Sequence, residues 1–426
     1  MGARRLPKAR PQGLATAGAA AAAGLLSLLL AWQIVAVAQA GRLARDMPAE
    51  ALKWRPAQAL ALARLAELRF ESGGAVSPGE TPEALARRAL AAGPLQVRAI
   101  RVLAWSAERE GDSRRALALM TIAGARSQRD AASHLWLLRN RLRARDFAAA
   151  YAHGDALMRN PAARRRGAAE MALSLGSDGG AQRALVNRLV YNPAWRISLI
   201  EQIASVQDPR LLLSMLLELK EKGSIVAEAE AAIVAQRLLS GGEAQQAYLA
   251  WVLLLPESGY ADLGVVYDGG FEGLPGKGPF AWDFDRKGFA QIMQAPYRDG
   301  RALSVSHTDS ARAVHAWQTL VLAPGPYQLS VDAFMENAGN GGRLWWRIGC
   351  ARGSQELATL DAPAKVGAWH TVSTAFLVPD TGCAAQTLEL YGSTEVTGNL
   401  IRGWFDSLRV QPASGDRDRG GRAHGA

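Results

Sequence analysis

Residues 318–336 read QTLVLAPGPYQLSVDAFME and decide the fold of the C-terminal part of this chain. Apolar and polar residues alternate on both sides of the Pro324-Gly325-Pro326 turn, the pattern of two β-strands that each bury one face. Further alternating runs within residues 259–412 are 302–306, 343–350, 371–378, 387–391 and 404–410. Seven or eight short strands in this region predict an antiparallel β-sandwich or jelly roll.

The preceding residues 49–255 have a different composition, rich in Ala, Leu, Arg and Glu, with apolar residues at helical spacing. Short turns such as Gly111-Asp112 separate the helical segments, so we expect stacked antiparallel helical hairpins. Leu103, Leu137 and Met171 are 34 residues apart in series. This period resembles the tetratricopeptide repeat over about residues 95–193, which implies an α-solenoid that holds protein partners on its concave surface. A generic array of α-hairpins is the alternative.

The N-terminus has the composition of a membrane anchor or a signal peptide. Residues 1–13 carry four basic residues and no acid, and residues 14–38 contain no charged residue. Twenty-five helical residues exceed the roughly 30 Å hydrocarbon core of a bilayer. We expect an uncleaved single-pass anchor; a signal peptide cleaved near Ala38 or Ala40 is the alternative. In both cases the basic flank stays in the cytoplasm and the remainder is exported.

The charge of the chain is divided among its segments. The 426 residues have a formal net charge of +10, and residues 1–40, 41–258, 259–412 and 413–426 contribute +4, +8, −3 and +1. The basic excess is spread over many helices of an exported protein, so no nucleic-acid partner is expected. The composition excludes a largely disordered chain, although the Gly- and Arg-rich tail 413–426 is expected to be disordered.

The order of motifs in residues 265–411 resembles the galactose-binding-like jelly rolls of carbohydrate-binding modules. The matching segments are Asp268-Gly269-Gly270-Phe271-Glu272, Phe280-Ala281-Trp282, 302–305, 318–330, Gly367-Ala368-Trp369 and Trp404-Phe405-Asp406. The resemblance implies a glycan partner, although such sandwiches also serve as structural modules. It also implies a structural calcium ion held by Glu272 and Asp406, for which an ordinary salt bridge or cap is the alternative.

Strand alternation predicts which side chains of the jelly roll form a glycan-binding face. Aromatic rings stack on sugar rings, and carboxylates and guanidinium groups bind the hydroxyls. The predicted outward-facing residues are Trp345, Phe334, Tyr391, Asp332, Glu336, Arg347 and Glu389. The alternative is that the aromatic residues cover the other sheet or pack on the helices. Trp369 and Trp404 are expected to fill the core.

The two cysteines, Cys350 and Cys383, are predicted to form a disulfide, because both belong to an exported domain; two separately buried thiols are the alternative. Closing this loop of about 34 residues would stabilise the fold by roughly 3–4 kcal/mol. No histidine has metal-binding spacing and no Gly-x-Ser-x-Gly motif is present, so we expect no enzyme activity. The predicted cofactor set is therefore empty apart from calcium.

Together these features predict a non-catalytic adaptor of exopolysaccharide or capsule assembly, anchored in a bacterial inner membrane with its bulk in the periplasm. The solenoid would bind proteins of the assembly machinery, and the jelly roll would contact envelope polysaccharide. A purely structural scaffold without sugar binding is the alternative, and a polysaccharide-modifying enzyme with two facing carboxylates is a weaker one.

Overall fold

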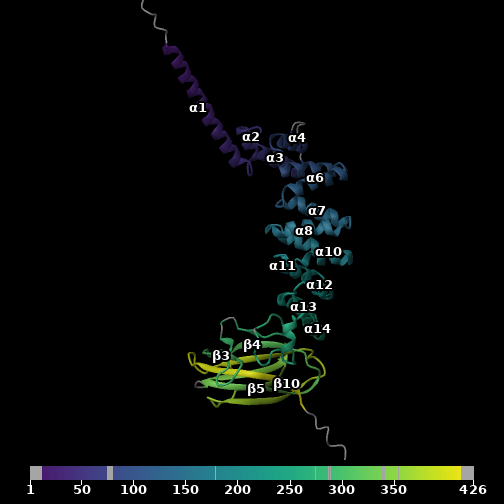
Figure 1. Cartoon of the computed structure of the whole chain (residues 1–426), viewed down its shortest axis with the longest axis vertical. Coiled ribbons are helices and arrows are strands. Elements are labelled where there is room, and N and C mark those ends of the chain that lie inside the picture. The colour runs from purple at the N-terminus through teal and green to yellow at the C-terminus, as the bar shows by residue number, and fades with distance from the viewer. Residues whose placement is uncertain are drawn as a thin grey trace, which may run out of the picture. The chain divides into compact units, whose positions relative to one another are not determined.

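The computed structural model describes residues 12–73, 80–177, 179–273, 275–285, 287, 289–337, 341–353 and 355–413. Its described residues form helices first and strands afterwards, as the colours of Figure 1 show from purple to yellow. The chain divides into two compact units, Met1–Glu170 and Met171–Ala426. The predicted basic segment 1–13 and the predicted tail 413–426 lie almost entirely outside the described residues.

The first unit is helical. Its helices are α1 (Gln12–Leu43), α2 (Pro48–Trp54), α3 (Ala59–Ser72), α4 (Pro82–Ala92), α5 (Val97–Arg109), α6 (Ser113–Arg126), α7 (Ala131–Arg143), α8 (Phe147–Arg159) and the start of α9 (Arg164–Leu173). Helices α5 and α7 begin 34 residues apart, and so do α6 and α8. The aspartates at the two equivalent N-caps, Asp112 and Asp146, accept hydrogen bonds from the backbone N–H groups of Arg115 and Ala149. The first residues of equivalent helices thus recur every 34 residues, while the tetratricopeptide assignment stays a prediction.

Helix α1 is long and apolar enough to cross a membrane over Ala21–Leu43, where its mean hydropathy is 2.1; a signal sequence has the same properties. Leu25, Leu26, Leu28, Leu29 and Leu30 of this segment are exposed, whereas Ala36 and Ala40 are buried. The ring of Trp32 lies 5.7 Å from that of Trp54 at the end of α2. Most of the segment is thus uncovered, and near its end it contacts α2.

The second unit begins within α9 and combines helices with all the strands. Its helices are η2 (Ser174–Ser177), α10 (Gly179–Leu189), α11 (Arg196–Val206), α12 (Pro209–Glu221), α13 (Glu228–Ser240), α14 (Ala244–Leu254) and η3 (Glu257–Asp262). Helix α14 joins them to the β-domain through rings: Trp251 lies 5.0 Å from Tyr267, and Tyr248 lies 5.4 Å from Phe280. These edge-to-face contacts are the favoured geometry for aromatic pairs.

The strands form two antiparallel five-stranded sheets (Figure 1). Sheet A has the order β1-β4-β9-β6-β7 and sheet B the order β2-β3-β10-β5-β8. The strands are β1 (Asp283–Phe284), β2 (Ala290–Gln294), β3 (Arg301–His307), β4 (Ala313–Leu320), β5 (Gly325–Asn337), β6 (Arg343–Cys350), β7 (Glu356–Asp361), β8 (Trp369–Val378), β9 (Gln386–Ser393) and β10 (Ile401–Pro412). The predicted fold class, helices followed by an antiparallel β-sandwich, is confirmed.

The core of the sandwich is made by alternate residues of both sheets. Leu329, Val331 and Ala333 of β5 meet residues such as Trp346 of β6, all of them at most 1% exposed. Gly403 of β10 leaves room for this packing, because a Cβ there would come within 2.9 Å of Leu344 Cδ1 and Met335 Sδ. Alternation therefore predicts correctly which residues of these strands face inward.

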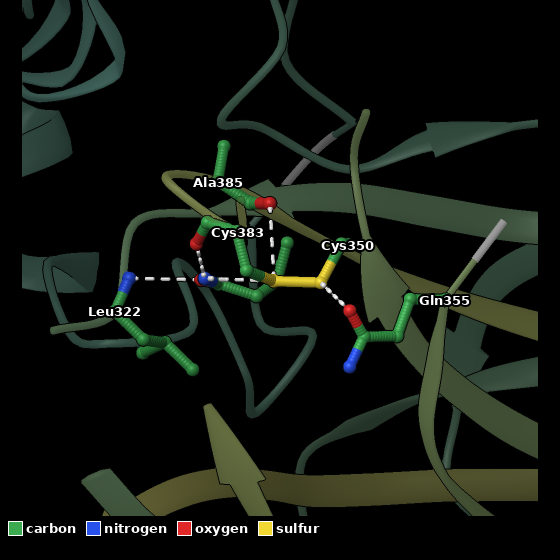
Figure 2. Close-up of a disulfide and its surroundings, with 6 residues drawn as sticks. Leu322, Cys350, Gln355, Cys383 and Ala385 are labelled. Carbon is green, nitrogen blue, oxygen red and sulfur yellow. Dashed lines mark hydrogen bonds between the residues drawn. A yellow bond between two sulfur atoms is a disulfide. The ribbon is translucent and has the colours of Figure 1, made fainter. Parts of the chain in front are cut away.

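Cys350 and Cys383 form the predicted disulfide, with their Cα atoms 5.1 Å apart (Figure 2). Cys350 ends β6, and Cys383 lies in the loop before β9. The amide of Gln386 donates to the carbonyl of Cys383 at 2.7 Å, and its Oε1 accepts from the N–H of Leu322 at 2.9 Å. The disulfide thus belongs to a buried network that fixes one end of sheet A.

Candidate functional site

The seven predicted glycan-binding residues lie on two sheets, so the expectation of one shared face is wrong. Trp345, Arg347, Glu389 and Tyr391 are on the outer face of sheet A, whereas Asp332, Phe334 and Glu336 are on β5 in sheet B. Alternation assigns a residue to one side of its strand, but it does not say which of two sheets the strand enters. The seven residues therefore form two separate groups, one on each sheet.

The side chains of the sheet A group contact one another. The rings of Trp345 and Tyr391 are stacked 5.4 Å apart, and Arg347 pairs with Glu389 at 2.8 Å. The guanidinium of Arg312 covers the Tyr391 ring at 3.9 Å. Trp345 is only 6% exposed, which leaves little ring surface for a ligand. The expectation that Trp345 forms an exposed platform is therefore wrong.

The charge of Arg347 is likewise already balanced. Burial would lower the pKa of its guanidinium, but hydrogen bonds to Glu389 and Glu356 outweigh that effect and raise the pKa. The Tyr391 hydroxyl donates to Glu389 at 3.0 Å. A ligand hydroxyl would have to replace these bonds, so this group has the properties of a structural network.

A row of aromatic residues crosses the outer face of sheet B. Trp404 of β10 is the cross-strand neighbour of Phe334 of β5, and Phe334 is the neighbour of Trp369 of β8. The row continues on the other side of Trp404 with Ser304 and Gln291. It therefore runs across all five strands. Trp369 and Trp404 are half-buried on the outer face, so the expectation that they fill the core is wrong.

The loop between β2 and β3 folds onto this row. The ring of Tyr297 lies 5.6 Å from Phe334, and the Trp369 indole N–H donates to the carbonyl of Pro296 at 2.8 Å. The guanidinium of Arg298 lies 4.0 Å from the centroid of the Trp369 ring. Tyr297 is 90% exposed and has a positive φ of 58°. This backbone conformation is unfavourable for a bulky residue, and it holds the phenol ring outside the sheet.

Charged and hydroxyl groups lie on both sides of the aromatic row. On one side, Arg298 pairs with Asp406 at 2.7 Å and Asp332 at 3.3 Å, and Thr371 donates to Asp332 at 2.6 Å. On the other side, Glu336 accepts from the Trp404 indole at 3.2 Å. The arrangement therefore combines flat rings with carboxylate and guanidinium groups on one exposed face. We call this set, from Gln291 to Trp369 with Tyr297 and these charged groups, the aromatic face.

The partners of Glu272 and Asp406 do not fit a shared calcium site. Glu272 Oε1 accepts from the backbone N–H of Arg301 at 3.0 Å, and Asp406 is paired with Arg298. In the described part of the chain, no cluster of three or more His, Cys, Asp and Glu side chains could hold a metal ion. The calcium ion stays a prediction.

The aspartate of the opening motif, Asp268, has a structural role. It accepts hydrogen bonds from the backbone N–H groups of Glu272 at 2.9 Å and Gly273 at 3.1 Å. Burial raises the pKa of this carboxyl to about 6, against the lowering effect of these two bonds. Its own carbonyl accepts from the indole of Trp282, which is 2% exposed and belongs to the core. Asp268 therefore fixes the entry of the chain into the sandwich.

Sequence reasoning missed Tyr297, Arg298 and the outward orientation of Trp369 and Trp404. Trp404 alternates with Phe405 in a run that was predicted as a strand, so its outward orientation follows from the same rule that was applied to β5. Tyr297 and Arg298 lie in a loop, and no local pattern indicates that this loop folds over the sheet.

No protein-family model and no curated protein matches this chain. Solved structures that it resembles include TmCBM61 in complex with β-1,4-galactotriose, at 14% identity, with 35% of this chain and 99% of that chain covered and a TM-score of 0.26. The CBM22-1 xylan-binding domain from Paenibacillus barcinonensis Xyn10C is another, at 11% identity, 34% and 94% coverage and a TM-score of 0.26. At these scores the similarities carry no argument about what this chain binds.

Proposed function

We propose that this chain is a non-catalytic, membrane-anchored adaptor whose β-sandwich binds glycan through the aromatic face. The observation that carries the proposal is the pair of half-buried rings Trp404 and Trp369, which lie on either side of the 4% exposed Phe334, together with the 90% exposed ring of Tyr297 next to Phe334. Stacking of flat rings on the apolar faces of sugars, with charged groups at the sides for hydroxyls, is the chemistry that such a row supports.

The remaining parts of the proposal concern place and partners. A span at α1 would anchor the chain in a bacterial inner membrane, with residues after the span in the periplasm. The disulfide supports an oxidising compartment. The helical hairpins would bind protein partners of an exopolysaccharide or capsule assembly system, by analogy with helical repeat proteins.

The test uses the full chain in a detergent that has no sugar headgroup. Binding to a panel of envelope polysaccharides is measured by affinity gel electrophoresis for the native chain and for Trp369→Ala, Trp404→Ala and Tyr297→Ala. We expect each substitution to weaken binding by about tenfold or more, the usual cost of removing an aromatic anchor. Tyr391→Phe, on sheet A, is the matched control and should bind as the native chain does.

A structural scaffold without sugar binding is the second candidate. One observation favours it: Arg298, Asp332 and Asp406 already satisfy one another on the aromatic face. In that case no polysaccharide of the panel binds, and envelope proteins still co-purify with the three alanine variants. Binding that survives in all three variants would instead exclude the aromatic face as the site.

A further inference from the structure

A cavity of about 1010 Å³ lies between helices α11 and α13 and the outer face of sheet A, inside the second unit. Trp317 and Thr319 of β4 and Thr387 of β9 line it on the sheet side, and Gln236 of α13 lines it on the helix side. Its volume is at the upper end of the roughly 300–1000 Å³ range of pockets that enclose small organic ligands. The cavity is distinct from the aromatic face, because the two lie on different sheets.

The walls of the cavity are fixed in place by the surrounding structure. Arg352 donates to the carbonyls of Leu239 at 3.3 Å and of Ser240, which ties a sheet A loop to the end of α13. The disulfide joins this loop to the loop before β9 (Figure 2). The N–H of Ala351 also donates to the carbonyl of Ala385 at 2.9 Å. A pocket whose walls are already ordered binds a ligand with a smaller entropic cost.

Trp317 differs from every other tryptophan of the chain. Among the described residues, each of the other eleven has a ring contact, a hydrogen bond or another specific interaction. Trp317 is half-buried at the cavity and has no side-chain partner within the described ranges. It offers the cavity a flat apolar ring and an N–H donor that the fold itself does not use.

Three polar side chains of the cavity also have no hydrogen-bond partner in the part of the chain that the structure describes: the amide of Gln236 and the hydroxyls of Thr319 and Thr387. The charged lining residues are two acids and two bases, Glu201, Asp283, Arg237 and Arg352, so their formal charges sum to zero. A neutral ligand would leave this balance of charge unchanged.

These observations identify the class of ligand. A flat ring with amide and hydroxyl groups suits a neutral sugar, whose rings have apolar faces and hydroxyl edges. An added peptide strand would need a free edge on β4, but the N–H of Thr319 already donates to the carbonyl of Pro279 at 2.8 Å. A lipid tail would leave the polar lining without partners.

We propose that this cavity is a second glycan site, which takes the end of a neutral oligosaccharide against Trp317. The inference shares with the proposed function only the premise that this chain meets glycans. An oligosaccharide bound in this cavity would lie between the helices and the sandwich, and its terminal sugar would contact both α13 and β4.

The test reads both sites in one sample. The full chain is labelled with 5-fluorotryptophan, and the ¹⁹F resonances of Trp317, Trp369 and Trp404 are assigned from their Phe variants. Neutral gluco-, galacto- and manno-oligosaccharides of two to six units are titrated in a detergent without a sugar headgroup. We expect a saturable shift of the Trp317 resonance. Gln236→Ala removes a lining amide and keeps this resonance, and it should weaken the Trp317 titration by about tenfold.

Asp361→Asn, an exposed change on β7 outside the cavity, is the matched control and should leave the Trp317 titration unchanged. A shift confined to Trp369 and Trp404 overturns the second site and leaves the aromatic face standing. A shift confined to Trp317 supports the second site and contradicts glycan binding at the aromatic face. A Trp317 resonance that responds to acidic peptides or lipid and to no sugar overturns the ligand class.

Discussion

The ring of Tyr297 lies 5.6 Å from the ring of Phe334, yet the first residue is 90% exposed and the second only 4%. The two adjacent rings therefore have different roles, one structural and one available to a ligand. Phe334 supports the face from below, and Tyr297 is the ring that a ligand could reach.

This division predicts different effects for the two alanine variants. Phe334→Ala should lower the free energy of unfolding by about 3–5 kcal/mol, because it deletes a buried ring. Tyr297→Ala should change stability by less than about 1 kcal/mol and weaken polysaccharide binding instead. Thermal unfolding and affinity gels on the same samples separate the effects; a large loss of stability in Tyr297→Ala would contradict the assignment.

Removal of the disulfide should destabilise the sandwich. In the chain-entropy model, opening a loop with a sequence separation of 33 residues costs about 3–4 kcal/mol. Denaturant unfolding of Cys350→Ser/Cys383→Ser should show this loss, and reductant should cause a similar loss in the native chain. Reductant should have no effect on the double variant, and any effect there would show that another cause is at work.

A buried ion pair in the second unit gives a double-mutant test. Arg196, 2% exposed, pairs with Glu230 at 2.6 Å and donates to Ser224 Oγ at 2.8 Å. Arg196→Met alone should cost about 3–5 kcal/mol, because it leaves the Glu230 carboxylate buried and unpaired. Arg196→Met with Glu230→Gln should cost clearly less. Additive losses, measured by urea unfolding, would mean that the two groups are not coupled.

The histidine pair between α7 and α8 predicts a pH dependence of the first unit. His134 and His153 approach to 3.1 Å between their Nδ1 atoms, and burial, then the neighbouring His134 and Arg141, lower the pKa of His153 to about 4. An unfolded histidine titrates near 6.5, so protonation favours the unfolded chain as the pH falls from about 6.5 to 4. Stability is therefore complete above this window and declines through it.

The measurement compares the native chain with His153→Gln over this pH range. The stability difference between them should shrink by about 2–3 kcal/mol from pH 7 to pH 4, which is the linkage for a shift of this size. Acid effects on carboxylates are common to both chains and cancel. A constant difference would show that His153 is not the titrating group.

The N-terminus of the mature chain should be uncleaved. The predicted cleavage positions near Ala38 and Ala40 lie inside α1, between the buried residues Ala36 and Ala44. Cleavage there would remove the Trp32–Trp54 contact and most of α1. Mass spectrometry of the membrane fraction should find the N-terminal peptide. A soluble chain beginning at residue 39 or 41 would contradict this expectation.

The fold class was predictable because each half of the chain keeps one period: helical spacing in residues 49–255 and alternation after 259. The inner and outer sides of β5 and β6 follow from that alternation. The division of the outer residues between two sheets does not, because strand order depends on pairing between distant segments. Alternation correctly places Trp345 and Phe334 on the outer sides of their strands. It does not predict that both are covered, because the residues next to them, Arg312 and Tyr297, come from loops far away in the sequence.

Trp317 was missed for a simpler reason. The alternating pattern predicts a strand that begins at residue 318, whereas β4 begins at Ala313. Extended by five residues, the same rule places Trp317 outward between the buried Ala316 and Gln318. Strand boundaries are the least reliable part of such predictions, and here the unpredicted first part of β4 contains Trp317.

The aromatic contacts of α14 bear on which fragment of this protein keeps the sandwich covered. Tyr248 and Trp251 cover Phe280 and Tyr267, so a fragment that starts at the first residue of the β-region would open these rings to water. A fragment that keeps these rings covered therefore includes α14 together with the sandwich.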